Sequence, residues 1–165
     1  MDKREYKRLN DLAVNGNAKA FSQLYELVYR EMYYTAFYTL SDDADATAAV
    51  IDVVKDAFSV IGKLRTEEAF VTYMMKGLCS RIKATLKYYA SEGREIKYSE
   101  SDYRPNDDGV DIRQEFNRLN DRERLVTSLY VAGKFSHAEI AKFTGMSSGA
   151  VKKHLHSALD CFALD

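Results

Sequence analysis

SHAEIAKFTGMSSGAVKKHLHSA, residues 136–158, is the stretch that decides how this chain folds. Ser136 and Glu139 have the spacing of a capping box, in which two side chains satisfy free backbone N–H groups at a helix start. The spacing therefore predicts a short helix over 138–143.

A tight turn follows that short helix. Ala141 is a small residue where two helices can cross closely, and Gly145, four residues later, can take the positive φ that such a turn requires. A second helix then begins at Ser147 or Ser148. The spacing favours a helix-turn-helix that binds DNA, although helix pairs with a glycine turn also occur in proteins that never touch DNA.

The second helix has one apolar and one polar face. Ile140, Met146, Val151 and Leu155 are predicted to fill the core of this small unit. The polar face carries donors at the helix N-terminus, where free backbone N–H groups also favour a phosphate. The predicted DNA contacts on this face are Ser147, Ser148, Gly149, Lys152, Lys153 and His156.

One more helix precedes this unit, and a long break precedes that helix. Asn120 and Glu123 repeat the capping-box spacing ahead of an apolar run that starts at Leu125. Periodicity is absent over 91–109, which holds the only proline of the chain. A structureless stretch of roughly twenty residues is uncommon inside one domain, so we predict a flexible linker. The predicted organisation is a domain over 1–90, a linker over 91–110 and a helix-turn-helix domain over 111–165.

The N-terminal domain contains three predicted amphipathic helices. Apolar side chains recur at three- and four-residue steps over 18–40, 46–64 and 66–89, the period of one helix face. Ser41-Asp42-Asp43 precedes the second helix, and its side chains can accept from first-turn N–H groups. Helices of this length can enclose a common core. The predicted fold class is therefore all-α, with two small helical domains joined by a flexible linker.

The net charge hides an uneven distribution. The 165 residues include 24 basic and 25 acidic side chains, a formal net charge of −1, whereas a nucleic-acid binder is expected to carry a basic field. Residues 76–90, however, carry +4, while 1–75 and 91–118 each carry −3 and 119–165 carry +1. Neutrality of the whole chain therefore conceals one basic helix.

Other classes of protein are disfavoured by the sequence. The charged start is followed by no apolar stretch, and no run of about eighteen uncharged apolar residues occurs, so we expect a cytoplasmic protein without a membrane partner. Cys79 and Cys161 are isolated and are expected to be buried or free thiols. His154 and His156 lie on different helix faces, which disfavours a shared metal. We expect no cofactor, and no catalytic set or phosphate-binding loop indicates an enzyme.

These motifs resemble a known family. The resemblance is to the C-terminal domain of small bacterial sigma factors of the extracytoplasmic-function (ECF) class, in the sigma-70 superfamily, and it is carried by LNDRER (119–124), GKFSHAEIA (133–141), GMS (145–147) and GAVKKHLHSA (149–158). It implies that residues 111–165 read the minus-thirty-five promoter element in the major groove.

The N-terminal domain resembles the other conserved domain of this family. That resemblance is carried by Phe21, Leu24 and Tyr25, by Asp45-Ala46, and by Phe70, Tyr73 and Met74. It implies docking on the beta-prime clamp of core RNA polymerase and binding of the minus-ten element. The family's acidic docking motif is thinned here, and the residues that keep acidic character are Asp45, Asp52 and Asp56.

The basic helix suits the DNA contacts that the family implies. The predicted contacts on it are Lys76, Arg81, Lys83, Lys87 and Tyr88. The four cations would contact phosphates, and Tyr88, which falls off the apolar stripe, would stack on a base exposed in melted DNA. Tyr73 and Tyr89 either stack in the same way or belong to the core.

Two functions stay open at the level of sequence. One is a sigma factor that directs RNA polymerase to specific promoters for transcription initiation. The other is a sigma-like DNA-binding regulator, or a partner-sequestering module, that has lost initiation; the thinned acidic motif and the near-zero net charge motivate it. The family also implies an anti-sigma factor as a partner, and the sequence carries no mark of one.

Overall fold

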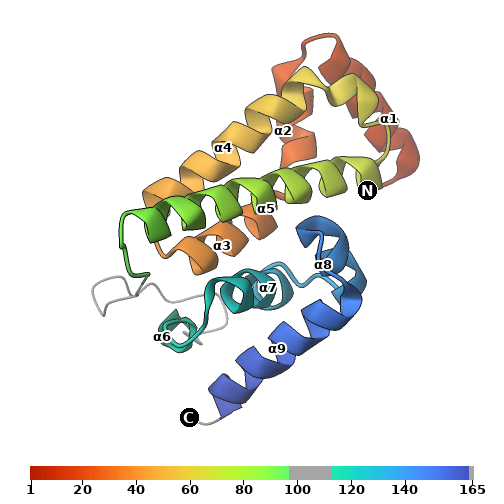
Figure 1. The fold of residues 1–165 in the computed structure, drawn as a ribbon. Coiled ribbons are helices and arrows are strands. Elements are labelled where there is room, and N and C mark those ends of the chain that lie inside the picture. The colour runs from red at the N-terminus through yellow and green to blue at the C-terminus, as the bar shows by residue number, and fades with distance from the viewer. Residues whose placement is uncertain (97–112, 164–165) are drawn as a thin grey trace.

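The computed structural model describes residues 1–96 and 113–163, and every regular element in these residues is a helix (Figure 1). The elements are α1 (Lys3–Val14), α2 (Ala18–Tyr25), α3 (Tyr29–Leu40), α4 (Asp43–Ser59), the 3₁₀ helix η1 (Ile61–Lys63), α5 (Glu67–Ser91), α6 (Arg113–Phe116), α7 (Asp121–Val131), α8 (His137–Thr144) and α9 (Ser148–Ala163). The all-α prediction is confirmed. Most of the predicted linker lies outside the described residues.

Residues 1–96 form the N-terminal unit, in which α3, α4 and α5 enclose the core (Figure 1). The α5 helix begins after Thr66, whose hydroxyl accepts from the Ala69 N–H at 3.0 Å. Where α4 and α5 cross, a Cβ at Gly77 would lie 3.0 Å from Val53 Cγ1, tighter than ordinary contact. The glycine therefore permits a close approach of these two helices.

The predicted helix over 18–40 is wrong in one respect, because it is two helices. The chain turns between α2 and α3, where the N–H groups of Leu27 and Val28 bond carbonyls three residues back, at 3.1 Å each. Val28 is buried in the core, so the apolar stripe continues through the turn although the helix does not. Periodicity alone therefore does not reveal the break.

Two further elements differ from the prediction. The second predicted helix ends at Ser59 rather than near Leu64, and η1 follows it. The α1 helix has no counterpart among the predicted helices, yet it packs on this same region. The Tyr6 hydroxyl donates to the Leu64 carbonyl at 2.5 Å, and Asn10 Nδ2 donates to the carbonyls of Ile61 and Leu64 at 2.9 and 3.0 Å. These bonds give buried partners to carbonyls at the start of η1 and just after its end, and they attach α1 to the segment between α4 and α5.

Residues 113–163 form the C-terminal unit, in which α7, α8 and α9 pack together. Both predicted capping boxes are present, Asn120 with Glu123 and Ser136 with Glu139, and each has both of its reciprocal bonds. The core predicted for this unit is confirmed in Ile140, Val151 and Leu155, each at most 3% exposed, and Met146 is partly buried against it.

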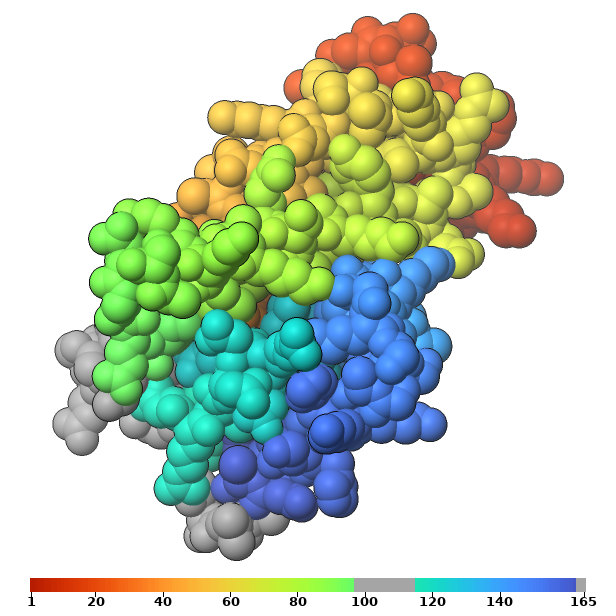
Figure 2. All heavy atoms as spheres, viewed as in Figure 1, coloured from red at the N-terminus to blue at the C-terminus, as the bar shows by residue number. Residues whose placement is uncertain are grey.

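The two units lie against each other rather than apart. Helix α7 packs on α3 and α8 packs on α5, and the buried apolar side chains of both units form one continuous cluster. Figure 2 shows the C-terminal unit in contact with α5 over much of its length. At the centre of the contact, Arg124 is 2% exposed, and its Nε donates to the Thr39 carbonyl at 3.1 Å.

Candidate nucleic-acid interface

The turn between α8 and α9 has the geometry that its sequence predicts. Gly145 has φ 76° and ψ 7°, in the left-handed region, and its N–H bonds the Ala141 carbonyl at 3.0 Å. Ser147 then accepts from the Ala150 N–H at 3.1 Å, which satisfies one free donor at the start of α9. The α8–turn–α9 unit is therefore a helix-turn-helix.

The polar face of α9 is open to solvent. All six predicted DNA contacts on it are exposed, namely Ser147, Ser148, Gly149, Lys152, Lys153 and His156. The opposite face buries Val151, Leu155 and Ala158. His156 Nε2 lies 3.5 Å from an Asp160 carboxylate oxygen, so one of the six already has an acidic neighbour one turn away.

The basic helix is α5. The residues on it that are predicted to contact DNA differ in whether they are exposed or already bonded within the chain. Lys76, Lys87 and Tyr88 are exposed, and Tyr88 keeps 60% of its surface. Arg81 pairs with Asp56 inside the same unit, at 2.5 Å from Nη2 to the carboxylate. Lys83 Nζ donates to the Thr144 carbonyl of the C-terminal unit. Two of the five predicted contacts are therefore already engaged within the chain.

Tyr89 belongs to the core, which settles one alternative for the aromatic side chains. It is 2% exposed, its hydroxyl donates to Asp45, and the Arg94 guanidinium lies 4.1 Å from its ring centroid. Burial raises the pKa of Tyr89 well above its ordinary value, and the hydrogen bond to Asp45 adds to the effect. Tyr73 is partly buried against the core. Tyr88 is therefore the tyrosine of α5 best placed to stack on a base.

The three acidic residues predicted to dock polymerase also differ in whether their carboxylates are already paired. Asp45 accepts from the Tyr89 hydroxyl and lies 3.6 Å from Arg94 Nη1, and Asp56 pairs with Arg81. Asp52 is exposed. A shallow cavity of about 320 Å³ between α4 and α5 brings together residues from both predicted sets, Asp45 and Asp52 with Arg81 and Tyr88.

Arg94 is a member of this site that the sequence did not single out, because it lies in the predicted linker. Its Nη2 donates to Asp42 at 2.9 Å. The pKa of Asp42 is lowered, first by the hydrogen bond from the Asp45 N–H at 2.8 Å and then by Arg94. Arg94, three residues after α5, therefore links the C-terminal end of α5 to the N-terminal end of α4. Its acidic partners are distant in the sequence, and Asp42 is 52 positions before it, so no local signal could have identified this pairing.

The segment that contains the helix-turn-helix is similar to a known protein family. Residues 110–161 match the family model described as Sigma-70, region 4. The matched segment contains α6 to α8 and most of α9, including all six exposed residues of the α9 face. Region 4 is a DNA-binding domain and not an enzyme family, so the match supports a sigma-factor-like DNA-binding role for the C-terminal unit. No curated protein matches the chain.

Two features of the described residues bear on other kinds of site. Over 1–96 and 113–163, no helix is both long and apolar enough to cross a membrane. In the same residues, no group of three or more His, Cys, Asp or Glu side chains is placed to hold a metal ion.

Proposed function

We propose that this chain is a sigma factor that directs core RNA polymerase to specific promoters. The observation that carries the proposal is the exposed polar face of α9, which follows the Gly145 turn inside the segment that matches Sigma-70, region 4. In this proposal α9 enters the major groove at the minus-thirty-five element, and Lys152 and Lys153 contact phosphates.

The N-terminal unit supplies the second half of the proposed function. Lys76, Lys87 and Tyr88 lie exposed on α5, where two cations and one aromatic ring suit single-stranded DNA at the minus-ten element. Asp52 is exposed on the neighbouring α4 and is the acidic residue that we propose to meet the polymerase clamp. The ECF subclass is part of the proposal and rests on the sequence resemblance.

Run-off transcription with purified core polymerase tests the proposal. Templates are first enriched from random or genomic DNA by capture with the full chain and core polymerase together. We expect discrete transcripts that require the chain. Failure to bind core, or to initiate on any enriched template, would overturn the proposal.

The contribution of α9 can be tested separately by its salt dependence. Replacing Lys152 and Lys153 by Ala removes two phosphate contacts, and each contact contributes about 0.9 to the slope of log K against log salt concentration. We expect the double variant to bind DNA of any sequence more weakly than the unmodified chain does. We also expect the magnitude of its slope of log K against log salt concentration to be smaller by about 2. The matched control is Lys19→Ala and Lys55→Ala, two exposed lysines on α2 and α4. An unchanged slope would show that the wrong helix face has been chosen.

A second function, a sigma-like regulator that has lost initiation, is favoured by one observation. Asp45 already binds Tyr89 and Arg94. Asp56 already binds Arg81, and all of these side chains belong to the N-terminal unit. Their carboxylates are therefore less available to a basic clamp. Capture on immobilised core polymerase separates the two functions: stable, salt-sensitive capture favours the sigma factor, and DNA binding without capture favours the regulator.

A further inference from the structure

A cavity of about 820 Å³ lies between α1 and the segment that joins α4 to α5. Two of the side chains that line it, Tyr6 and Asn10, are almost fully buried, at 2% and 5% exposed. Cavities of roughly 300–1,000 Å³ that combine apolar side chains with a few polar groups are typical of sites for small molecules. The size and the mixed lining therefore suit an organic ligand.

The two walls of this cavity run in opposite directions along the chain. Asn10 bonds the carbonyls of Ile61 and Leu64, whereas Tyr6, one turn nearer the start of α1, bonds only the Leu64 carbonyl. The facing segment therefore returns from residue 67 towards residue 61 as α1 proceeds. The start of α1 thus faces the start of α5, and the end of α1 faces η1.

The end of the cavity beside η1 is apolar and open to water. Val14 is 52% exposed there. A second cavity, of about 340 Å³, continues past Val14 to Phe58, which is 41% exposed. Because Val14 and Gly62 line both cavities, the two form one continuous groove, which we call the α1 groove. An apolar ligand would release the water that contacts these side chains, which favours binding.

Gly62 keeps the middle of the α1 groove open. Its φ lies outside the left-handed region, and a Cβ added there would meet only Val14, at 3.5 Å and beyond, which is ordinary contact. Neither the backbone conformation nor the packing of helices therefore requires a glycine at this position. A longer side chain would extend into the space that the two cavities share. An occupant of the groove accounts for its absence.

The other end of the α1 groove carries cations. Lys3 and Arg65 line it, and among the residues that the structure describes neither has a carboxylate within ion-pair distance. Arg65 Nε donates to the Gly62 carbonyl at 3.4 Å, which leaves the Nη1 and Nη2 donors for a ligand. A guanidinium presents such donors in a planar fork that matches a carboxylate.

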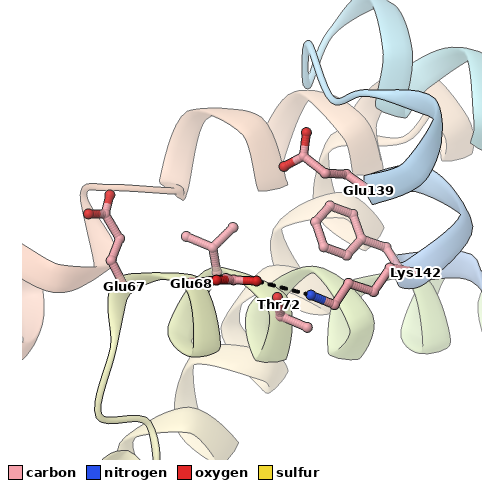
Figure 3. Close-up of a pocket in the computed structure, with 7 residues that line it drawn as sticks. Glu67, Glu68, Thr72, Glu139 and Lys142 are labelled. Atoms are coloured by element: carbon pink, nitrogen blue, oxygen red, sulfur yellow. Dashed lines mark hydrogen bonds and ion pairs between the residues drawn. The ribbon is translucent and has the colours of Figure 1, made fainter.

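Three carboxylates also line the groove, and all three are already paired. The pairs are Asp11 with Lys7, Glu67 with the Met1 amino group and Glu68 with Lys142, at 3.5, 3.1 and 3.4 Å. Figure 3 shows Glu68 and Lys142 pointing toward each other beside a neighbouring cavity of about 410 Å³ between α5 and α8. The charge that remains without a partner at this end of the groove is therefore positive.

From the cationic end, the apolar end and the glycine between them, we infer that the α1 groove binds a medium-chain fatty acid as its carboxylate. The carboxylate lies between Lys3 and Arg65, and the hydrocarbon chain runs past Gly62 to Val14 and Phe58. Along α1, Lys3 and Val14 are about 16 Å apart at about 1.5 Å per residue, which suits an extended chain of medium length.

The occupant is a free fatty acid rather than a membrane lipid. The α1 groove has one cationic end and one apolar path, so it holds one chain, whereas a phospholipid has two. None of the residues predicted to contact DNA or polymerase lines the groove. The inference therefore goes beyond the proposed function and does not depend on it.

Titration of the full chain with decanoate, followed by amide NMR spectra, tests the inference. We expect saturable shifts at Val14, Gly62 and Arg65 and none at Lys152 and Lys153 on α9. Decanol, a probe of the same chain length without the charge, should bind about tenfold more weakly, because it makes no ion pairs. Shifts spread over the whole chain, or shifts that do not saturate, would overturn the inference.

The charged end is tested by a double variant. Lys3→Ala with Arg65→Ala should weaken decanoate binding about tenfold and leave decanol binding unchanged. Arg4→Ala with Lys19→Ala removes two exposed cations that do not line the groove, and this matched control should bind both probes as the unmodified chain does. If the first double variant binds decanoate as tightly as the control, the inference is wrong.

The path of the hydrocarbon chain is tested at Gly62. Gly62→Leu fills the groove and should weaken binding of both probes about tenfold or more. Gly62→Ala adds only a methyl group in ordinary contact with Val14 and should bind normally. Unweakened binding by a folded Gly62→Leu chain would overturn the inference. If Gly62→Leu does not fold, the double variant at Lys3 and Arg65 decides the question.

Vesicles of phosphatidylglycerol distinguish a membrane surface from a free fatty acid as the source of the acyl chain. We expect the chain to bind decanoate and to stay in the supernatant when such vesicles are sedimented. Sedimentation with the vesicles in the absence of decanoate binding would overturn the inference, because a surface and not an enclosed chain would then be recognised.

Discussion

Gly145 sets the angle between α8 and α9 through its backbone conformation alone. Its φ is 76°, and a Cβ added there would meet no atom within 4 Å, so a larger residue is opposed by backbone strain and not by a clash. A non-glycine residue in this region costs about 1–3 kcal/mol, and a β-branched side chain lies at the upper end. We expect Gly145→Val to lower the free energy of unfolding of the C-terminal unit by about 2–3 kcal/mol, measured by urea denaturation.

Gly149 provides the matched control for this prediction. It lies in α9, and a Cβ there would meet only the Ser147 hydroxyl at 4.0 Å. Alanine is favoured over glycine in a helix by up to about 1 kcal/mol, so Gly149→Ala should leave stability unchanged or raise it. Equal stability of Gly145→Val and the unmodified chain would show that the turn does not depend on positive φ.

Asp42 gives the N-terminal unit a pH-dependent contribution to stability. Its lowered pKa means that the ionised form is favoured in the folded state, first by the Asp45 N–H and then by Arg94. A lowered pKa contributes stability above the unfolded value, near 3.8, and that contribution is lost as the pH falls through the folded value. Asp42→Asn keeps a capping side chain but loses the charge.

We therefore expect Asp42→Asn to reduce the free energy of unfolding by about 0.5–1 kcal/mol at pH 7, as for a charge at a helix N-terminus. The difference from the unmodified chain should shrink as the pH falls below 3.8 and close once the pH is below the lowered folded pKa of Asp42, where this side chain is neutral in both states. Urea denaturation at a series of pH values measures it. A difference that stays constant with pH would mean that the charge of Asp42 contributes nothing.

At the scale of elements, the buried Arg124 side chain hydrogen-bonds α7 to the end of α3, in addition to the apolar contact between these helices. Replacing Arg124 by Met leaves the Thr39 carbonyl without the Arg124 donor, while the Phe116 carbonyl keeps its bond from the Leu119 N–H; an unsatisfied buried carbonyl costs about 1–3 kcal/mol. We expect a loss of that size in urea denaturation. Arg122→Met, on the exposed face of the same helix, is the control and should change stability by less than about 0.5 kcal/mol. Similar effects of the two substitutions would contradict the role given to Arg124.

The sequence predicts those elements whose signals are local. Asn120, Ser136 and Thr66 start helices by bonding N–H groups three residues ahead, so their spacing is visible in the sequence. The break between α2 and α3 has no such marker, because Val28 in the turn is buried and the apolar stripe continues through it. Helix α1 does have a local start signal, because Asp2 accepts from the Arg4 N–H at 2.6 Å; what spacing cannot show is where α1 packs, since Asn10 bonds carbonyls more than fifty residues away.

The candidate nucleic-acid interface also has one part that the sequence predicts and one part that it does not. The face of α9 follows from helix periodicity, and all its predicted residues are exposed. Which cations of α5 are free to bind DNA does not follow from periodicity. Arg81 pairs with Asp56, 25 positions away, and Lys83 bonds the Thr144 carbonyl, 61 positions away. Sequence spacing identified these side chains as basic but could not show that neighbouring helices already hold them.

At the scale of the whole molecule, the contact between the units predicts the size of the free protein. A compact chain of this length has a radius of gyration near 15 Å, whereas two separated units would give a clearly larger value. We expect small-angle X-ray scattering of the free chain to give a value within about 2 Å of 15 Å. A value above about 20 Å would show that the units are apart in solution.

The hydroxyl groups of Thr35 and Thr39, which are buried where α3 packs on α7, also have a consequence during synthesis. Chains emerge from the ribosome N-terminus first, at about 5–20 residues per second, so the α3 face waits some seconds for α7 to be made. An apolar face left uncovered for that time would invite aggregation. Thr35 and Thr39 place hydroxyl groups there, which water can hydrate until the C-terminal half of the chain is complete. Thr35 and Thr39, which end up buried in the finished protein, therefore protect the nascent chain.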